Sequence, residues 1–413
     1  MFFPLFFKEC RQIAKSLVYY LYLIILVLFL TSQLSDGDWS DRLTEPKPGQ
    51  ESYGFKESED ETLIMESTLA ELVRETDWNS YATYPFMFYK EVTLNDSELA
   101  EIEQILFECT GKSFEQLLDE MDAHFSGYDQ STMEGAPISG QTFLVEPAED
   151  LTFEEFQNAM KRVCGIIGKG SAFEPEKLTA SEPKTYEDAL EDYRALCEKD
   201  KVTGAYMRLF CDYAGIMLVI LPIFLGATRC LRDKRADAQQ VIYARAASSL
   251  QVVGSRYLAN LFMAFLPVVL IAFLLQSPYL YLARTNGVAP DVFAFLKYSV
   301  GWLLPTLMVT LALSFVLTEL IGNVFAVILQ VFWSFACIAL ETSLVGEFGF
   351  HLEPRWNTVG NTQSFFAQLG QLAINRLFYL LLAILLFGLT VLIFDRKRKG
   401  GVFWHGKNSK SRG

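Results

Sequence analysis

Residues 258–283 read LANLFMAFLPVVLIAFLLQSPYLYLA, a run of 26 residues that contains no acidic or basic side chain. A bilayer core about 30 Å thick is crossed by roughly 20 apolar residues in a helix, because a helix satisfies its backbone polar groups internally. Five further segments are similarly apolar, namely Ile13–Ser32, Leu209–Thr228, Phe293–Leu317, Ile321–Leu340 and Leu377–Phe394. The sequence therefore predicts an all-α polytopic membrane protein with six transmembrane helices.

The first of these segments also has to be compared with a signal peptide. Its apolar stretch Leu17–Leu30 is long for a signal-peptide core, and the residues that follow it, Thr31-Ser32-Gln33-Leu34, lack a small-x-small cleavage pattern. We interpret the segment as an uncleaved signal anchor.

Charge is divided unevenly along the chain. Of its 49 acidic residues, 39 lie in residues 33–201, together with only 14 of the 35 basic residues. Basic residues collect instead before the first span, between the second and third spans, and after the last span. Because short cytoplasmic loops retain Lys and Arg, this pattern predicts a multi-pass protein of the cell membrane with both termini in the cytoplasm. Basic residues that flank apolar helices do not form the soluble basic face expected for nucleic-acid binding.

The acidic segment 33–205 is long enough to form an extracytoplasmic domain with its own core between the first two spans. Alternating strand patterns are limited to Tyr84–Val92 and Thr142–Val145, so we expect a mostly helical domain with one small hairpin. Residues 35–60 are rich in Asp, Glu, Ser, Gly and Pro and predict a linker. Capping patterns predict four helix starts, at Asn95…Glu98, Ser113…Gln116, Thr152…Glu155 and Thr185…Asp188.

Residue types suited to catalysis or metal binding are sparse. The chain has only three histidines, far apart in the sequence, and no glycine-rich nucleotide fingerprint. Cys109, Cys164 and Cys197 in the acidic segment allow at most one internal disulfide, and small buried hydrophobes are an equal interpretation. We expect no enzyme, no metal site and no cofactor on this chain.

Polar residues and helix breakers inside the spans give a weaker signal. The ionisable residues there are Asp212, Lys297 and Glu319, all within a turn or two of a membrane boundary, where a structural role is favoured over an ion relay. Helix breakers favour a transport role, because they bend helices that line a pathway; they are Pro222, Pro267, Pro278, Gly301, Pro305 and Gly388.

The loop between the second and third spans, residues 229–256, carries the clearest functional pattern. It opens with the charged run from Arg232 to Asp237 and closes with Gly254–Leu258 at the next span. Between these runs, one narrow apolar helical face is formed by Ile242, Ala246, Leu250 and Val253. A short amphipathic helix of this kind suits docking of a cytoplasmic partner, or it rests in the lipid headgroups.

This loop, together with six spans and a large outer insertion after the first, resembles the permease subunits of type-2 ABC transporters. The likeness rests on Asp233–Arg235, Ile242–Arg245, Ser248-Ser249 and the Gly254–Leu258 entry into the third span. Where many members have Arg-Pro followed by a small residue and Ser, this chain has Arg245-Ala-Ala-Ser248. The resemblance covers the spans and the loop, about half of the chain, and leaves the acidic domain unmatched.

The resemblance implies that the loop is a coupling helix seated in a cleft of a separate ABC ATPase subunit. A second permease subunit would complete a homodimer or heterodimer, and ATP and Mg would bind to the ATPase. The implied contact residues are Asp233, Arg235, Asp237, Ile242, Tyr243, Arg245, Ser248 and Leu250. In such families the outer loop before the last span often dips back as short helices, and residues 366–376 have the periodicity for one.

The expected function is that of an ABC exporter's membrane subunit. Its expected parts are a first segment at 1–32, the acidic extracytoplasmic domain at 33–205, a five-helix transmembrane domain at 206–395 and a basic cytoplasmic tail at 396–413. An alternative is a membrane-anchored receptor or assembly factor whose acidic domain binds a ligand. An intramembrane enzyme is disfavoured, since the sequence offers no catalytic constellation.

Overall fold

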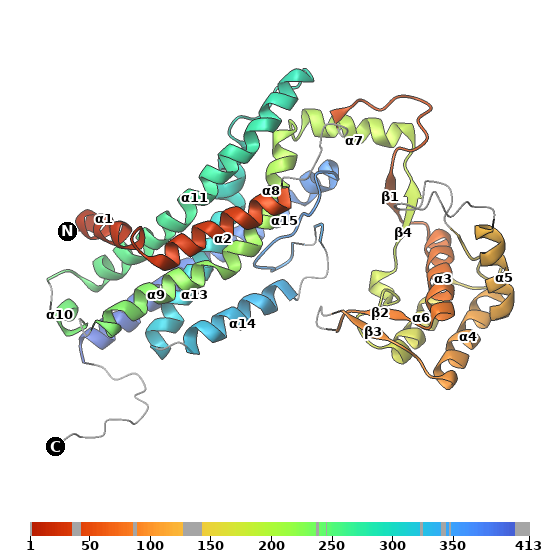
Figure 1. The fold of residues 1–413 in the computed structure, drawn as a ribbon, viewed down its shortest axis with the longest axis horizontal. Coiled ribbons are helices and arrows are strands. Elements are labelled where there is room, and N and C mark those ends of the chain that lie inside the picture. Colours follow the sequence, from red (N-terminus) through yellow and green to blue (C-terminus); the bar gives the residue numbers. More distant parts are fainter. Residues whose placement is uncertain are drawn as a thin grey trace. The chain divides into compact units, whose positions relative to one another are not determined.

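The computed structural model describes residues 2–34, 43–85, 89–126, 143–236, 239–244, 246–322, 325–339, 344–346 and 348–400. The chain forms two compact units (Figure 1). The first, here called the membrane unit, combines Met1–Thr44 with Asp192–Gly413. The second, here called the acidic unit, is Glu45–Glu191, which lies within the range 33–205 expected for the acidic domain.

The membrane unit is built from helices. They are α1 (Phe2–Ile13), α2 (Leu17–Leu34), α8 (Thr203–Ile220), α9 (Pro222–Arg235), α10 (Gln239–Tyr243), α11 (Ser249–Thr285), α12 (Ala294–Tyr298), the π-helical turn η5 (Ser299–Leu303), α13 (Leu304–Ile321), α14 (Phe325–Ala339) and α15 (Thr362–Arg398). Among the described residues, five helical stretches are long and apolar enough to cross a membrane: Leu17–Leu34, Thr203–Asp233, Ser249–Thr285, Ala294–Ile321 and Thr362–Arg398. The prediction of an all-α polytopic membrane protein is thereby confirmed.

The segment predicted as the fifth span differs from the others. Its helix, α14, has 15 residues, which gives a length of about 22 Å and falls short of the bilayer core. The predicted spans Phe293–Leu317 and Ile321–Leu340 leave residues 318–320 as the turn between them, but α13 runs on to Ile321 and its C-cap is Gly322. Gly322 has φ of 67°, a left-handed conformation that glycine adopts without steric cost, and the helix ends at Ile321, four residues after the predicted Leu317.

Close helix packing in the membrane unit depends on small residues. Helix α11 buries Ala259, Ala264 and Ala272, and the Tyr22 hydroxyl of α2 donates a hydrogen bond of 2.6 Å to the Ala264 carbonyl. Small residues allow helix backbones to approach closely in a membrane. The Tyr22 hydrogen bond links α2 to α11. Figure 1 shows α2, α8, α9, α11 and α13 running side by side in this bundle.

A non-helical segment, residues 348–361, enters the bundle before α15. Its Leu352 and Trp356 are buried, and the Thr306 hydroxyl of α13 donates to the Leu352 carbonyl at 3.0 Å. Irregular backbone is tolerated in a membrane bundle only where protein groups satisfy it. The short separate helix expected around residues 366–376 is absent as such, since these residues form the first part of the continuous helix α15.

The acidic unit is a small helical domain with two short antiparallel pairs of strands. Its elements are β1 (Phe55–Ser58), α3 (Glu61–Trp78), β2 (Tyr81–Thr83), β3 (Lys90–Val92), α4 (Asp96–Thr110), α5 (Phe114–Phe125), α6 (Phe153–Ile167), the single turn η4 (Pro175–Lys177) and β4 (Ala180–Pro183); α7 (Tyr186–Glu198) leads out of it. Strand β1 pairs with β4 and β2 pairs with β3. The fully buried Leu69, Ile105 and Val163 bring α3, α4 and α6 into one core.

In the acidic unit, the helix starts were predicted more accurately than the strands. Capping boxes start α4, α5 and α6 at Asn95, Ser113 and Thr152, as predicted. At the fourth predicted start, the Asp188 carboxylate accepts from the Thr185 N–H at 2.9 Å. The hairpin is β2–β3, whereas residues 143–145 form no strand, and the predicted linker contains β1.

Candidate functional site

The predicted coupling loop is folded against the helix ends and is not one continuous helix. Helix α10 has only five residues, and α11 begins at Ser249 with a capping box between Ser248 and Gln251. The predicted apolar face from Ile242 to Val253 is therefore interrupted, because the Ser248 cap starts a new helix inside it. Ile242 and Val253 still pack in one cluster, around the buried Phe394 of α15.

Two of the predicted contact residues take part in structure within the chain. The ring of Tyr243 packs edge-on against that of Phe394, with centroids 5.4 Å apart. Ser248 is exposed and caps α11. Leu250 differs from both, since 58% of its surface is exposed on the first turn of α11. Of these three residues, Leu250 is the one with an exposed apolar side chain.

The C-terminal end of α15 holds the loop in place. Arg398 donates hydrogen bonds to the backbone carbonyls of Tyr243, at 2.9 Å, and Ala247, at 2.7 Å. The Ser249 hydroxyl donates to the Asp395 carboxylate at 2.8 Å. Displacement of the loop therefore has to move the end of α15 or break these bonds.

Three buried charges and the partly buried Asp233 join three helices beside the loop, and we call these four residues the loop-end network. Glu9 of α1 accepts two hydrogen bonds from Arg229 of α9, at 2.5 and 2.6 Å. Arg229 also donates to Asp233 at 3.1 Å, and Arg256 of α11 donates to the other oxygen of Asp233 at 2.5 Å. The predicted contact residue Asp233 is thus ion-paired with two arginines of the same chain, and 16% of its side chain is exposed.

The remaining predicted contacts are only partly described. Arg235 is the last residue of α9, while Asp237 and Arg245 lie outside the described residues. The sequence did not indicate that Glu9 is buried, because a single carboxylate in a short amphipathic helix usually faces solvent. Its burial to 8% exposure follows from the packing of α1 against α11.

Two ion pairs lie toward the opposite end of the bundle, where α8 begins; one is fully buried and the other almost so. Asp212 accepts from Arg355 at 2.8 and 3.0 Å and from the Trp356 N–H at 2.7 Å. Asp212 lies nine residues into α8, about 14 Å along the helix axis, and has no exposed surface. It therefore does not reach the boundary by snorkelling; it anchors the segment that enters the bundle.

The second buried pair fixes the turn that leads into α8. Arg208 donates to Asp200, and the Thr362 hydroxyl at the start of α15 donates to the other oxygen of Asp200 at 2.6 Å. Both members of the pair are fully buried. The other two ionisable residues predicted within spans form more exposed pairs, Lys297 with Asp291 and Glu319 with Lys397.

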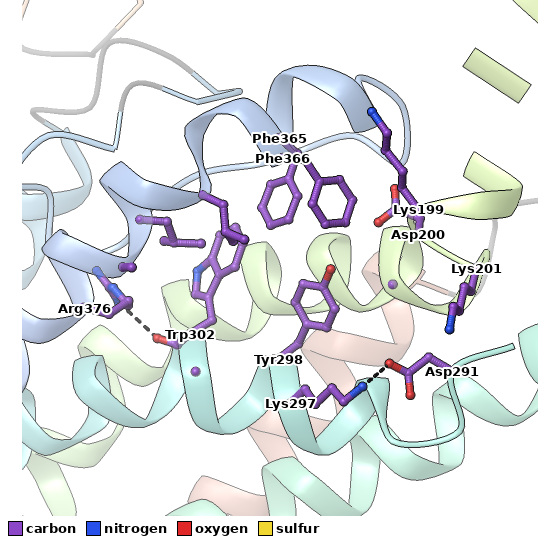
Figure 2. Close-up of a pocket in the computed structure, with 15 residues that line it drawn as sticks. Lys199, Asp200, Lys201, Asp291, Lys297, Tyr298, Trp302, Phe365, Phe366 and Arg376 are labelled. Carbon is purple, nitrogen blue, oxygen red and sulfur yellow. Dashed lines mark hydrogen bonds and ion pairs between the residues drawn. The ribbon is translucent and has the colours of Figure 1, made fainter. Parts of the chain in front are cut away.

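A cavity of about 540 Å³ lies beside this turn, and we call it the α8-end pocket (Figure 2). Its walls come from α8, η5 and α15, and it contains the predicted apolar face of residues 366–376. Periodicity indicated that face, but its opposite wall comes from residues 199–204 and 297–302, which only tertiary packing brings near.

The described residues contain no group of three or more His, Cys, Asp or Glu arranged to hold a metal ion, and all seven cysteines are unbridged. No family model, curated protein or solved structure matches the chain. A function for this chain is therefore inferred from its own residues and contacts.

Proposed function

We propose that this chain is the membrane-spanning permease subunit of an ABC exporter. It would cross the cell membrane six times, with α14 as the fifth span, α15 as the sixth and both termini in the cytoplasm. A separate ATPase subunit would contact the loop 229–256, and a second permease subunit would complete the transporter. ATP and Mg would bind on the ATPase.

The observation that carries this proposal is the mechanical coupling of the loop to several spans. Arg398 ties the loop backbone to α15, and Asp233 ties the loop's first residues to α11 through Arg256. Through Arg229, the same network reaches Glu9 of α1. A partner that moves the loop would therefore shift the ends of α1, α9, α11 and α15, as a two-state transporter requires.

Exposed apolar residues on the loop support a partner contact. Val241 on α10 is 62% exposed and Leu250 on α11 is 58% exposed. Exposed apolar side chains beside a charged rim are typical of protein interfaces. The tethered loop would present them on a rigid support.

The test is purification of the full chain from its native host, with sequence identification of bound proteins and measurement of ATP hydrolysis. We expect an ABC ATPase to co-purify with the wild type and to be lost with Leu250→Asp. The matched control is Phe107→Asp, which places the same charge at a residue that is 50% exposed in the acidic unit. Retention of the ATPase by Leu250→Asp, or recovery of no ATPase with the wild type, would contradict the proposal.

A membrane-anchored receptor or assembly factor is the second candidate. The acidic unit favours it, because this unit has its own core and its own compact boundary. A receptor would retain its ligand when the ATPase is absent, and Leu250→Asp would leave its output unchanged. The same purification therefore separates the two candidates.

A further inference from the structure

The α8-end pocket has the size and composition of a small-molecule site. Its volume of about 540 Å³ falls within the roughly 300 to 1,000 Å³ typical of ligand pockets. Aromatic residues dominate its inner wall, where Trp302 stacks on Phe365 with ring centroids 6.0 Å apart and planes 8° apart. Figure 2 shows the rings of Phe365 and Phe366 facing Tyr298 across the cavity.

The charges around the pocket leave an excess of positive charge at its rim. Of the two acidic residues in the lining, Asp200 is bound by Arg208 and Asp291 is bound by Lys297. Lys199 and Lys201 are exposed, and neither has an acidic partner within ion-pair distance in the described parts of the chain. The rim therefore offers two ammonium groups to an anion.

The closed side of the pocket adds positive potential without adding a direct contact. The Arg376 guanidinium is buried and donates to the Trp302 carbonyl at 3.0 Å and the Thr306 hydroxyl at 2.7 Å. Its field acts in a region from which water is largely excluded, where electrostatic interactions are strong. An anion at the rim would be attracted by this charge as well.

Backbone geometry at the rim is held in a costly conformation. Lys201 and Val202 have φ of 52° and 64°, and positive φ is sterically unfavourable for a β-branched residue such as Val202. The buried pair of Asp200 and Arg208 fixes this turn. A π-helical turn, η5, forms the adjacent wall. Strained turns and π-helical turns persist mainly where they serve a site.

We propose that the α8-end pocket binds an amphiphile that has one anionic head and an apolar body. The apolar body lies against Trp302, Phe365 and Phe366, and the head lies at the rim, where Lys199 and Lys201 supply the positive charge. The inference concerns binding by this chain and goes beyond the proposed transport function, so it stands whether or not an ATPase is the partner.

The test uses the purified full chain in nanodiscs of zwitterionic lipid. The probe is a photoreactive, diazirine-bearing fatty acid, and crosslinked residues are mapped by mass spectrometry. We expect crosslinks at Phe365, Phe366 and Trp302, with competition by oleate and at least about tenfold weaker competition by oleyl alcohol, which has the same chain without the charge. Crosslinks spread over lipid-facing helix surfaces, or equal competition by the two compounds, would overturn the proposal.

Two kinds of variant examine the pocket without breaking its packing. A Cβ at Gly301 meets no atom within 4 Å, so Gly301→Leu would fill the cavity; Gly388 in α15 is equally open and lies outside the pocket, so Gly388→Leu is the control. We expect Gly301→Leu to lose the pocket crosslinks and Gly388→Leu to retain them. Should Gly301→Leu misfold, the double variant Lys199→Glu/Lys201→Glu tests the proposal instead, because both side chains are exposed. We expect its labelling to be about tenfold weaker than that of the wild type. Unchanged labelling would contradict the proposal.

A second probe distinguishes the source of the amphiphile. Photoreactive phosphatidylglycerol is built into the nanodisc, and the free fatty acid is omitted. Pocket labelling by this lipid shows that a phospholipid of the bilayer occupies the site, whereas labelling only by the added fatty acid shows that the site takes a free single-chain amphiphile. Labelling of the pocket by neither probe overturns the proposal.

Discussion

The carboxylate of Glu9 and the guanidinium of Arg229 form two hydrogen bonds, although 220 residues separate them in the chain. The pair is almost completely buried, and it holds α1 against the end of α9. Taking two charges out of water is costly, so such a pair contributes more to specific positioning than to net stability. Removal of one partner, however, leaves the other charge buried alone.

We expect Arg229→Met to lower the free energy of unfolding by about 3 kcal/mol, because Glu9 is left without its bidentate partner. The measurement is denaturant unfolding of the full chain in detergent, followed by circular dichroism. Arg232 on the same helix is the matched control, since it binds Gln12 on the exposed surface at 2.8 Å. Arg232→Met should change the unfolding free energy by less than about 0.5 kcal/mol, and equal effects of the two substitutions would refute the assignment.

A second prediction concerns the strained turn before α8. Both Lys201→Ala and Lys201→Gly remove the exposed side chain, but only glycine adopts the observed φ of 52° without steric cost. We expect the glycine variant to be more stable than the alanine variant by about 1 kcal/mol in the same unfolding measurement. Equal stability would show that the turn stores no strain.

Glu75 gives the acidic unit a dependence on pH. Burial, together with the nearby charge of Glu71, raises the pKa of its carboxyl to about 7. A carboxyl whose pKa is higher in the folded state stabilises the fold when protonated. That contribution is complete below the unfolded pKa, near 4.5, and is lost as the pH rises through about 7.

We therefore expect the acidic unit to lose about 1 to 2 kcal/mol of stability between pH 5 and pH 8, after allowance for partial solvation of the carboxyl. Hydrogen exchange of the α3 amides in the full chain, corrected for the intrinsic pH dependence of exchange, measures this loss. Glu75→Gln should abolish it, whereas Glu71→Gln should retain most of it. A wild type without such a pH dependence would contradict the shift.

Labelling of cysteine variants with an impermeant maleimide in intact cells tests the orientation of the chain in the membrane. We expect Ser97→Cys in the acidic unit to react and Ala246→Cys in the loop to be protected, because both residues are exposed and we place them on opposite sides. All seven native cysteines are buried or partly buried, so the wild type provides the background. Labelling of Ala246→Cys alone would invert the proposed topology.

The apolar helices and the helix starts were readable from the sequence because both depend on neighbours within one or two turns. Residues 258–283 needed only their own composition to predict a span, and Asn95 needed only Glu98 three residues later to predict a helix start. The short α14 and the shifted end of α13 show where such local signals become less exact.

What the sequence determined by itself was therefore the class of protein: apolar helices joined to an acidic domain with capped helices. Tertiary structure alone decided that Asp212 meets Arg355 across 143 residues, that Asp233 turns inward, and that Lys201 and Phe366 line one pocket. The physical reason is that buried charges and cavity walls are defined by partners from distant segments. No periodicity encodes these partners, and only the packing of the helices brings them within a few ångströms of each other.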